Sequence, residues 1–252
     1  MIIEKINDKN YFIWRRTPWD EKVFQKKTME ITEIVYENII SLREIFKKVN
    51  DLVEFERIEL VFFRHNSFDK YIKKEAFLND FQIVEHSYYV RHSNISKITR
   101  NRKQLNFRRP KKEDVASIIK IVTDSFSHGR FHEDPNIDEE LAKLRYKQWI
   151  PQLMKDTNFF VLELKGEVAG FFNYVVNNNT IDLPLSGISS KYSGLGGFMW
   201  KEMFKIIDEN EEVKQVKIMI SATNLTVLNL YTSLDFKIAE SLFGYHKHIR
   251  RN

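Results

Sequence analysis

A glycine-rich turn lies between an apolar segment and a segment of helical character. The turn reads Lys-Tyr-Ser-Gly-Leu-Gly-Gly over residues 191–197 and follows an apolar run, Ile181 to Ile188. A helix is expected after it, from about Phe198 to Asp208. Backbone N–H groups and the helix dipole at a helix N-terminus favour anions, and glycines keep side chains out of the way. The pattern therefore indicates a turn that binds phosphate oxygens.

The turn is not specific by itself, because Gly-Leu-Gly-Gly also occurs in ordinary turns. It is not a Walker loop, since no Gly-Lys-Ser/Thr follows, and Met199 stands where a dinucleotide fingerprint has its last glycine. The first 128 residues contain no glycine, and all eight glycines lie between Gly129 and Gly244. Only the C-terminal half can therefore form a phosphate-binding glycine turn.

Asn224 and Tyr231 lie seven residues apart, directly after a predicted strand at 213–221. On a helix, seven residues make about two turns, so both side chains point the same way. A tyrosine hydroxyl that faces a pocket can donate a proton to a leaving thiolate. The alternative is a core tyrosine and an asparagine that starts a helix.

Hydrophobic spacing predicts alternating helices and strands on both sides of a basic segment. Before it we expect a helix from about Ile31 to Val49, a strand at 58–63, a helix at 69–78 and a strand at 81–90. After it we expect a helix from about 113 to 126, a second helix that ends near 154, and strands at 158–164, 168–176 and 180–188. Beyond the glycine turn and its helix we expect a strand at 213–221, a short helix at 225–234 and a closing strand at 236–249. Leu-Asn-Asp-Phe-Gln-Ile at 78–83 echoes Leu-Asp-Phe-Lys-Ile at 234–238, which suggests a degenerate internal repeat, with chance similarity as the alternative.

Composition limits the classes of function. The chain has 252 residues, 42% of them hydrophobic, with no cysteine and a net charge of +5. This length suits one large domain or two of about 100–150 residues. The lack of cysteine excludes disulfides, thiolate metal sites and a cysteine nucleophile. We read no signal sequence and no apolar run near the membrane-spanning length of about 18 residues, which predicts a cytoplasmic protein with no membrane partner.

Basic residues concentrate in segment 97–112, which carries eight Lys or Arg and no acidic residue. Such a segment could bind nucleic acid. We favour a solvated linker, because Phe107 is its only aromatic residue and no nucleic-acid-binding module accompanies it. The expected organisation is an N-terminal α/β domain at 1–96, a basic linker at 97–106 and a second domain at 107–252.

The order of these features resembles the GNAT acetyltransferase superfamily. The features are the glycine turn, its helix, the strand after that helix, Asn224 and Tyr231. That family has a Gln/Arg-x-x-Gly-x-Gly/Ala pyrophosphate turn, a helix, a strand, an Asn and, seven residues later, a Tyr before a Leu-Gly-Phe turn. Here Lys191 replaces the Gln or Arg, and Asp235 replaces the glycine of Leu-Gly-Phe. The resemblance covers 107 to about 250. It implies an α/β (α+β) GNAT fold with a mixed, largely antiparallel sheet, preceded by a smaller N-terminal α/β domain that could be a degenerate GNAT-like half.

The same resemblance implies acetyl-CoA as the acetyl donor and Tyr231 as the general acid that protonates the CoA thiolate. It places cofactor binding at the end of the preceding strand, in the turn and on the following helices. The predicted set is Gly187, Ile188, Ser189, Lys191, Ser193, Gly194, Leu195, Gly196, Gly197, Asn224 and Tyr231. GNAT chemistry needs no metal, so no metal site is expected.

Residues 126–150 look more narrowly like the TDP-fucosamine N-acetyltransferase family. Those enzymes carry an Arg-Phe, an Asp and a downstream Tyr-x-x-Trp, and their N-terminal half opens with a Trp-Asp segment. The implied acceptor is a nucleotide-linked amino-deoxy sugar, whose diphosphate suits basic groups and whose base stacks on aromatic rings. The predicted substrate-binding residues are Trp19, Arg130, Phe131, Asp134, Tyr146, Trp149 and Asp182.

Transfer to an amine needs a base that removes a proton, directly or through water. The candidates are His128, His132, Glu133, Asp134 and Asp182, and each can equally be read as a solvated loop or surface residue. The sequence does not choose among them. The His, Glu and Asp residues at 128–134 match no strong metal motif.

The prediction is an N-acetyltransferase that moves an acetyl group from acetyl-CoA to a nucleotide-linked amino-deoxy sugar, TDP-linked, by direct attack. One alternative is a GNAT enzyme that acetylates a protein N-terminus, a lysine or a small amine, although such enzymes usually lack an extra N-terminal domain. A second is a non-catalytic nucleic-acid-binding module. A homodimer through an open sheet edge is an alternative to a chain whose own N-terminal domain covers that edge.

Overall fold

The computed structural model describes residues 1–98, 105–156 and 158–250, and divides into two compact units. Unit 1 contains residues 1–87, 128–142 and the C-terminal residues from 240 on, and unit 2 contains residues 88–127 and 143–239. The predicted domain boundaries divide the sequence linearly, whereas the units interleave along it, and those boundaries stay a prediction. Most of the expected basic linker, residues 99–104, lies outside the described residues. No helix in the described part of the chain is long and apolar enough to cross a membrane.

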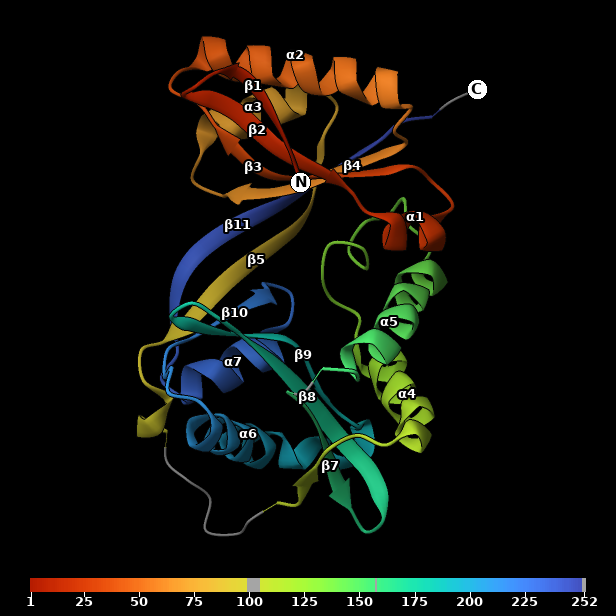
Figure 1. Cartoon of the computed structure of the whole chain (residues 1–252), viewed down its shortest axis with the longest axis vertical. Helices are drawn as coiled ribbons and strands as arrows, with labels where there is room; N and C mark the ends of the chain where they lie inside the picture. The colour runs from red at the N-terminus through yellow and green to blue at the C-terminus, as the bar shows by residue number, and fades with distance from the viewer. Residues whose placement is uncertain (99–104, 157, 251–252) are drawn as a thin grey trace. The chain divides into compact units, whose positions relative to one another are not determined.

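Unit 1 is built on a sheet whose one face is covered by two helices (Figure 1). The sheet order is β1 (Ile2–Asn7), β2 (Asn10–Arg16), β3 (Thr28–Val35), β4 (Leu60–Asn66), β11 (Lys237–His248) and β5 (Gln82–His92). The helices α2 (Ile39–Glu56) and α3 (Lys70–Leu78) share a core with the sheet that includes Phe46, Phe63 and Tyr245. A short helix, α1 (Pro18–Phe24), joins β2 to β3.

The N-terminal half departs from the sequence-based prediction before α2. The predicted start of the helix over Ile31–Val49 is wrong, because its first part is β3 and α2 begins only at Ile39, whereas residues 39–49 are helical as predicted. The segment 28–35 is rich in β-branched residues, which fit a strand, and it pairs with β2 and β4. Asn38 then starts α2, since its side chain accepts hydrogen bonds from two backbone N–H groups of the first turn.

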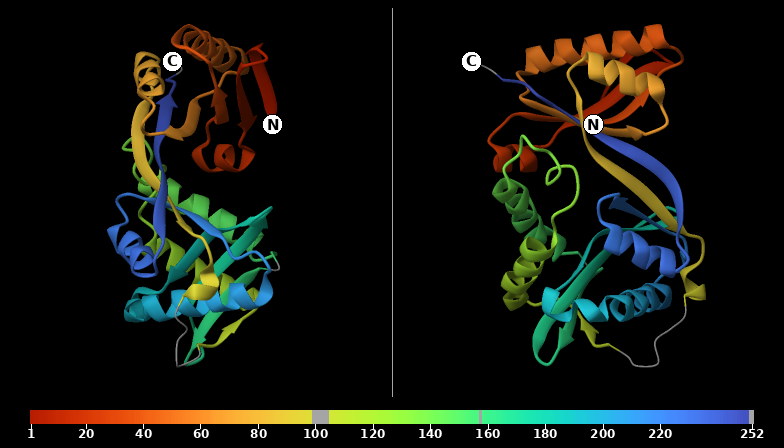
Figure 2. Two further views of the ribbon diagram at one scale, coloured as in Figure 1. Left: turned by 90° about the vertical axis from the view of Figure 1, so that its left-hand side faces the viewer. Right: turned by 180° about the vertical axis from the view of Figure 1, so that it is seen from behind.

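Unit 2 has helices on both faces of its sheet (Figure 2). After the end of β5 the order is β10 (Val216–Ser221), β9 (Thr180–Ile188), β8 (Glu167–Asn177), β7 (Phe159–Leu164) and β6 (Phe107–Arg108). Alternate residues of β7 point to opposite faces. Phe160 shares a core with α6 (Gly196–Asn210) and α7 (Leu225–Ser233), and Phe159 shares one with α4 (Val115–Ser125) and α5 (Glu139–Leu153). The mixed, largely antiparallel pairing confirms the predicted fold class.

The same order of elements occurs twice in the chain. Residues 2–92 (repeat A) and residues 159–248 (repeat B) each contain three strands, a helix, a strand, a helix and a strand, in that order. Repeat A has α1 in addition, and repeat B has a 3₁₀ turn. In each repeat the third and fourth strands are parallel. A left-handed residue follows the second helix in both, Asp80 with φ 62° and Asp235 with φ 65°. These parallels support the internal repeat that the sequence suggested.

The last strand of repeat B explains why the units interleave. β11 pairs with β4 of repeat A, in a register that joins Leu242 to Asn66 and His248 to Leu60. The C-terminal residues of the chain are therefore part of the unit that its N-terminus forms.

Replacing Gly170 in β8 with alanine is expected to destabilise unit 2. A Cβ there would lie 2.8 Å from Met199 Sδ and 2.9 Å from the backbone oxygen of Gly187. The methionine can move, but the carbonyl is fixed in β9, so we expect the free energy of unfolding to fall by about 1–3 kcal/mol in chemical denaturation. Gly194→Ala is the matched control, because a Cβ at Gly194 meets no atom within 4 Å. Equal losses in both variants would contradict the packing argument.

Candidate active site

The parallel strands β9 and β10 pair with each other only near their starts. Within the described residues their register comprises Val216 with Ile181 and Lys217 with Asp182. Both strands continue beyond these pairs without further pairing to each other. Backbone groups of β9 that face β10 past this point have no strand partner on that side, so an extended ligand can use them.

The glycine turn follows directly on β9. Residues Ser190–Leu195 form a 3₁₀ turn, and α6 begins at Gly196, which is earlier than the predicted start at Phe198. In the described structure no side chain caps α6, and the preceding 3₁₀ turn supplies a backbone acceptor, since Gly196 N–H donates to Ser193 O. A Cβ at Gly194 or Gly196 would meet no atom within 4 Å, so the space beside the turn is open.

In repeat A the corresponding helix is α2, and a side chain caps its N-terminus. At the start of α2, Asn38 Oδ1 accepts hydrogen bonds from Ile40 N at 2.9 Å and from Ser41 N at 3.1 Å. No glycine occurs in this repeat. A pyrophosphate needs exposed N–H groups and a close approach to the backbone. Of these two helix termini, only that of α6 therefore has no side-chain cap and has glycines that keep the space beside the backbone open.

Tyr231 in α7 has 2% of its surface exposed. Its hydroxyl oxygen accepts a hydrogen bond from Trp200 Nε1 at 2.8 Å and is also hydrogen-bonded to the side chain of Ser186. Ser186 lies on β9, beyond its pairs with β10. Burial raises the pKa of Tyr231, and the two hydrogen bonds offset only part of that rise. The hydroxyl thus keeps its proton beside the part of β9 that is open to a ligand, as a general acid requires.

The remaining residues predicted to bind the cofactor form two groups. One group lies at the end of β9 and in the glycine turn, and the other, Asn224 and Lys191, already interacts with other residues of the chain. The first group is Gly187, Ile188, Ser189, Ser193, Leu195 and Gly197. Asn224 Oδ1 accepts a hydrogen bond from Val227 N at 3.2 Å, which is the helix-starting role considered as the alternative. Lys191 Nζ lies 2.5 Å from Glu167 Oε2 at the surface, so a ligand at the turn would compete with Glu167 for this ammonium group.

Two of the predicted substrate-binding residues in unit 1 differ strongly in exposure. Trp19 is 47% exposed in α1, with the Arg15 guanidinium 5.5 Å from its ring centroid. Arg130 is only 8% exposed, and its Nη2 lies 2.9 Å from Glu30 Oε1. Burial would raise the pKa of Glu30, but Arg130 and Arg15 outweigh it and lower that pKa. Arg130 therefore forms a buried ion pair within the unit.

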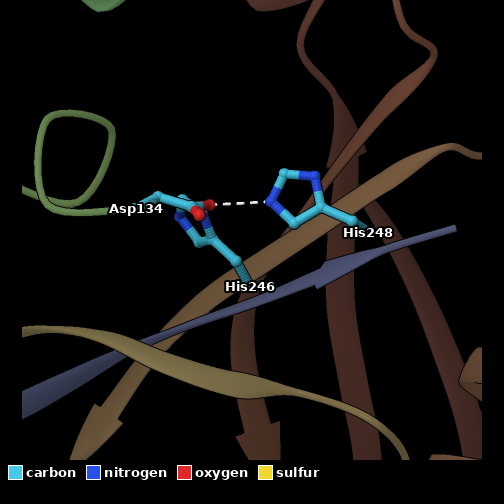
Figure 3. A group of neighbouring side chains, drawn as sticks. All are labelled: Asp134, His246 and His248. Atoms are coloured by element: carbon cyan, nitrogen blue, oxygen red, sulfur yellow. Dashed lines mark hydrogen bonds and ion pairs between the residues drawn. The ribbon is translucent and has the colours of Figure 1, made fainter. Parts of the chain in front are cut away.

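The other two, Phe131 and Asp134, are buried close to each other in unit 1. The Phe131 ring packs against Phe62 and against His246. Asp134 Oδ2 lies 2.6 Å from His246 Nδ1 and 2.7 Å from His248 Nε2 (Figure 3). Burial opposes ionisation of Asp134, but the hydrogen bonds from the two histidines outweigh it and hold the carboxyl pKa well below its usual range. Burial lowers the pKa of His246 to about 4, so this ring is neutral at pH 7.

The last three predicted substrate-binding residues lie in unit 2. Tyr146 and Trp149 in α5 stack, with ring centroids 6.4 Å apart. Asp182 accepts a hydrogen bond from Asn177 Nδ2 at 2.6 Å and lies in the paired part of β9, about 13 Å along the strand from Ser186. The structure therefore brings Tyr231 together with the end of β9 but leaves Asp182 away from it. Among the other candidate bases, Glu133 accepts a hydrogen bond from Gly129 N at 2.7 Å.

Sequence reasoning missed Trp200, which orients Tyr231, and the two histidines beside Asp134. Trp200 lies in α6, one helix before the tyrosine, and no local pattern links the two side chains. His246 and His248 did carry a usable signal, because residues two apart in a strand point to the same face. Their carboxylate partner is distant in the sequence, so the pattern alone could not find it.

The chain was compared with family models, with known protein sequences and with solved structures. The chain matches no family model. It is 19% identical over 239 residues to the spore coat polysaccharide biosynthesis protein SpsD of Bacillus subtilis (strain 168), covering 90% of this chain and 80% of that protein.

Solved structures resemble the chain over nearly its whole length. A GCN5-related N-acetyltransferase from Sphaerobacter thermophilus has a TM-score of 0.66 at 10% identity, covering 97% of this chain and 78% of that one. A functionally unknown conserved protein from Staphylococcus epidermidis ATCC 12228 has a TM-score of 0.68 at 8% identity, with 99% and 94% covered. A tandem GNAT protein from the clavulanic acid biosynthesis pathway has a TM-score of 0.59 at 10% identity, with 89% and 76% covered. The chain therefore has the fold of the GCN5-related N-acetyltransferases, as its turn and tyrosine predicted.

Proposed function

We propose that this protein is an acetyl-CoA-dependent N-acetyltransferase that acetylates the amine of a nucleotide-linked amino-deoxy sugar, with a TDP-linked sugar as the first candidate. The observation that carries the proposal is the position of the Tyr231 hydroxyl. It is buried, protonated and held by Trp200 and Ser186 where β9 leaves β10. The uncapped start of α6 follows on the same strand.

The residues that would hold acetyl-CoA belong to repeat B. The turn from Ser193 to Gly197 would hold the pyrophosphate through backbone N–H groups other than that of Gly196, which donates to Ser193 O, and the free edge of β9 from Ser186 to Ser189 would hydrogen-bond the pantetheine arm. Bound there, acetyl-CoA supplies an activated acetyl group to a neutral amine. Tyr231 Oη then holds the proton that the departing sulfur needs.

The acceptor class rests on resemblance and on one relative. The residues Trp19, Arg130, Phe131, Asp134, Tyr146 and Trp149 follow the pattern of TDP-fucosamine N-acetyltransferases. SpsD, at 19% identity, is described as a spore coat polysaccharide biosynthesis protein. A nucleotide-linked amino sugar is a substrate that fits both. The base that takes the amine proton stays open among His128, His132, Glu133, Asp134 and Asp182.

A thiol-release assay tests the proposal. The full chain is incubated with acetyl-CoA and a panel of TDP- and UDP-linked amino sugars, with peptides, polyamines and a no-acceptor reaction as controls. CoA release with one amino-sugar nucleotide is the expected result, and mass spectrometry of the product locates the acetyl group. Release only with peptides or polyamines would retain the transferase and overturn the sugar acceptor. No release and no acetyl-CoA binding by calorimetry would overturn the enzyme assignment, and salt-sensitive DNA binding would then support the nucleic-acid alternative.

Replacing Trp200 with phenylalanine is expected to lower kcat about threefold to tenfold with little change in the KM for acetyl-CoA. The change removes the hydrogen bond that orients the Tyr231 hydroxyl, and such a bond contributes about 1 kcal/mol. Trp14→Phe is the matched control, because the Trp14 indole is buried in unit 1 and its N–H has no hydrogen-bond partner among the described residues. Steady-state kinetics and melting temperatures separate the two. A similar loss of kcat in both variants would count against orientation by Trp200.

A further inference from the structure

His246 and His248 have no role in the proposed reaction, although both contact Asp134, one of its candidate bases. Asp134 lies in the segment between α4 and α5, and the two histidines lie on β11. Because they are two residues apart in a strand, both rings point to the same face of the sheet, toward the carboxylate (Figure 3). All three residues belong to unit 1, whereas Tyr231 and the glycine turn belong to unit 2.

The three side chains converge on a single oxygen atom. His246 Nδ1 and His248 Nε2 both approach Asp134 Oδ2, at 2.6 and 2.7 Å. The other carboxylate oxygen accepts hydrogen bonds from Asn136 N at 2.8 Å and Asn136 Nδ2 at 3.2 Å, which fixes the carboxylate plane. One potential ligand atom from each residue lies within 4.8 Å of the others.

Hydrogen bonding within the described residues leaves this group incomplete. His246 Nε2 and His248 Nδ1 are buried and have no hydrogen-bond partner there. Asp134 and His246 are 2% and 0% exposed, so bulk water does not solvate them. Native proteins pair almost all such buried polar atoms. These two nitrogens are not the ones that approach Asp134 Oδ2, so a metal ion bound by His246 Nδ1 and His248 Nε2 would leave them to donate to water.

A second His–Asp pair in unit 1 shows what a completed structural contact looks like. His65 Nε2 lies 3.0 Å from Asp69 Oδ2. The Asp69 carboxylate also accepts a hydrogen bond from Tyr36 Oη at 2.7 Å, and it caps α3 through two backbone N–H groups. No third metal ligand joins this pair in the described part of the chain. It therefore serves as a matched comparison for the group on β11.

We infer that Asp134, His246 and His248 bind a divalent transition-metal ion of the zinc class. Two imidazoles and one carboxylate form a donor set that zinc and cobalt accept, whereas magnesium and calcium prefer oxygen ligands alone. Metal–ligand bonds of about 2.0–2.1 Å place neighbouring ligand atoms of a tetrahedral site about 3.3 Å apart. The two nitrogens lie 2.6 and 2.7 Å from Asp134 Oδ2, so each must move away by about 0.6–0.7 Å to admit the ion.

The ion would join two segments that are far apart in the sequence. It would fasten the segment that carries Arg130 and Phe131 to the last strand of the chain. Three protein ligands leave a fourth position for water or a small anion. Metal binding here does not require the proposed acetyltransferase activity, and it would remove Asp134 from the candidate bases.

The test is metal binding by the full chain, prepared without a polyhistidine tag and freed of metal with a chelator. Isothermal titration with Zn²⁺ and visible absorption with Co²⁺ measure stoichiometry and affinity. We expect one ion per chain, a Co²⁺ spectrum typical of four ligands, and an affinity at least 100-fold weaker in His248→Asn. The control His65→Asn should bind as the unmodified chain does. Binding that is absent, or that is equal in His248→Asn and the unmodified chain, would overturn the site.

Thermal unfolding gives a second readout that needs no activity. A ligand that binds only the folded chain raises the melting temperature. Zn²⁺ should raise the melting temperature of the unmodified chain and of His65→Asn, but not that of His248→Asn. His248 is the first choice because its side chain is 16% exposed and tolerates substitution better than the fully buried His246. An equal rise in all three proteins would place the metal elsewhere and refute the proposal.

Discussion

Replacing Tyr231 with phenylalanine should lower kcat for acetyl transfer by about 10²–10³-fold and leave the KM for acetyl-CoA nearly unchanged. The substitution keeps the buried ring, its contacts with Phe204 and Phe236, and the shape of the core. It removes only the hydroxyl that Trp200 and Ser186 hold. Without it the departing sulfur must take its proton from water.

Tyr174→Phe is the matched control for this prediction. Tyr174 is also buried in unit 2, and its hydroxyl donates to Glu211 Oε1 at 2.8 Å near the end of α6. Losing this hydrogen bond should lower the melting temperature slightly and leave kcat within about twofold. Steady-state kinetics with both variants decide the matter. An unchanged kcat in Tyr231→Phe, or equal losses in both, would remove the proposed acid role.

The pH dependence of kcat offers an independent check on the same residue. Burial raises the pKa of Tyr231 above its ordinary value of about 10, so the hydroxyl is protonated across the neutral and mildly alkaline range. An acid that titrates only at very high pH gives no loss of kcat as the pH rises from 7 to about 9.5. A loss within that range that is absent in Tyr231→Phe would show that the tyrosine ionises earlier than its burial predicts.

Local sequence patterns predicted the fold best where one signal dominated. The glycine turn and the alternating strands of repeat B were placed correctly, because glycine and period-two alternation are strong local signals. The segment 31–35 was misassigned because its isoleucines and valine fit helical spacing as well as a strand. The exchange of β11 into the unit of repeat A could not be predicted, since local patterns do not name the partner of a strand.

The candidate site shows the same limit at the level of single residues. Tyr231 was identified by its spacing from Asn224, yet the structure uses Asn224 as a helix cap. Trp200, which orients the tyrosine, lies on another helix and has no spacing rule to reveal it. Asp134 and His246 are separated by 112 positions, so only the folded chain brings them together. The sequence-based expectation of no metal rested on GNAT chemistry and on the spacing of residues 128–134, and it did not include the histidines of β11.

Replacing Gly196 with aspartate should weaken acetyl-CoA binding by about 100-fold without harming the fold. A Cβ at Gly196 meets no atom within 4 Å, and its φ of −50° suits any residue. An aspartate at a helix start also interacts favourably with the dipole, by about 0.3–1 kcal/mol, so the melting temperature should stay level or rise. The new carboxylate would repel a pyrophosphate, because like charges about 4 Å apart cost about 4 kcal/mol at an effective dielectric of 20, before solvent screening.

A loss of acetyl-CoA affinity in Gly196→Asp together with a level or higher melting temperature would distinguish a phosphate-binding turn from an ordinary one. Gly196→Asn adds a side chain of the same size without the charge, so calorimetry should find a smaller loss of acetyl-CoA affinity in it than in Gly196→Asp. Raising the salt concentration should narrow the difference, since salt screens the repulsion between exposed charges. If Gly196→Asp bound acetyl-CoA as tightly as the unmodified chain, the pyrophosphate would have to lie elsewhere. The start of α6 would then be an ordinary turn, whose N–H groups are satisfied by the Ser193 carbonyl and by water.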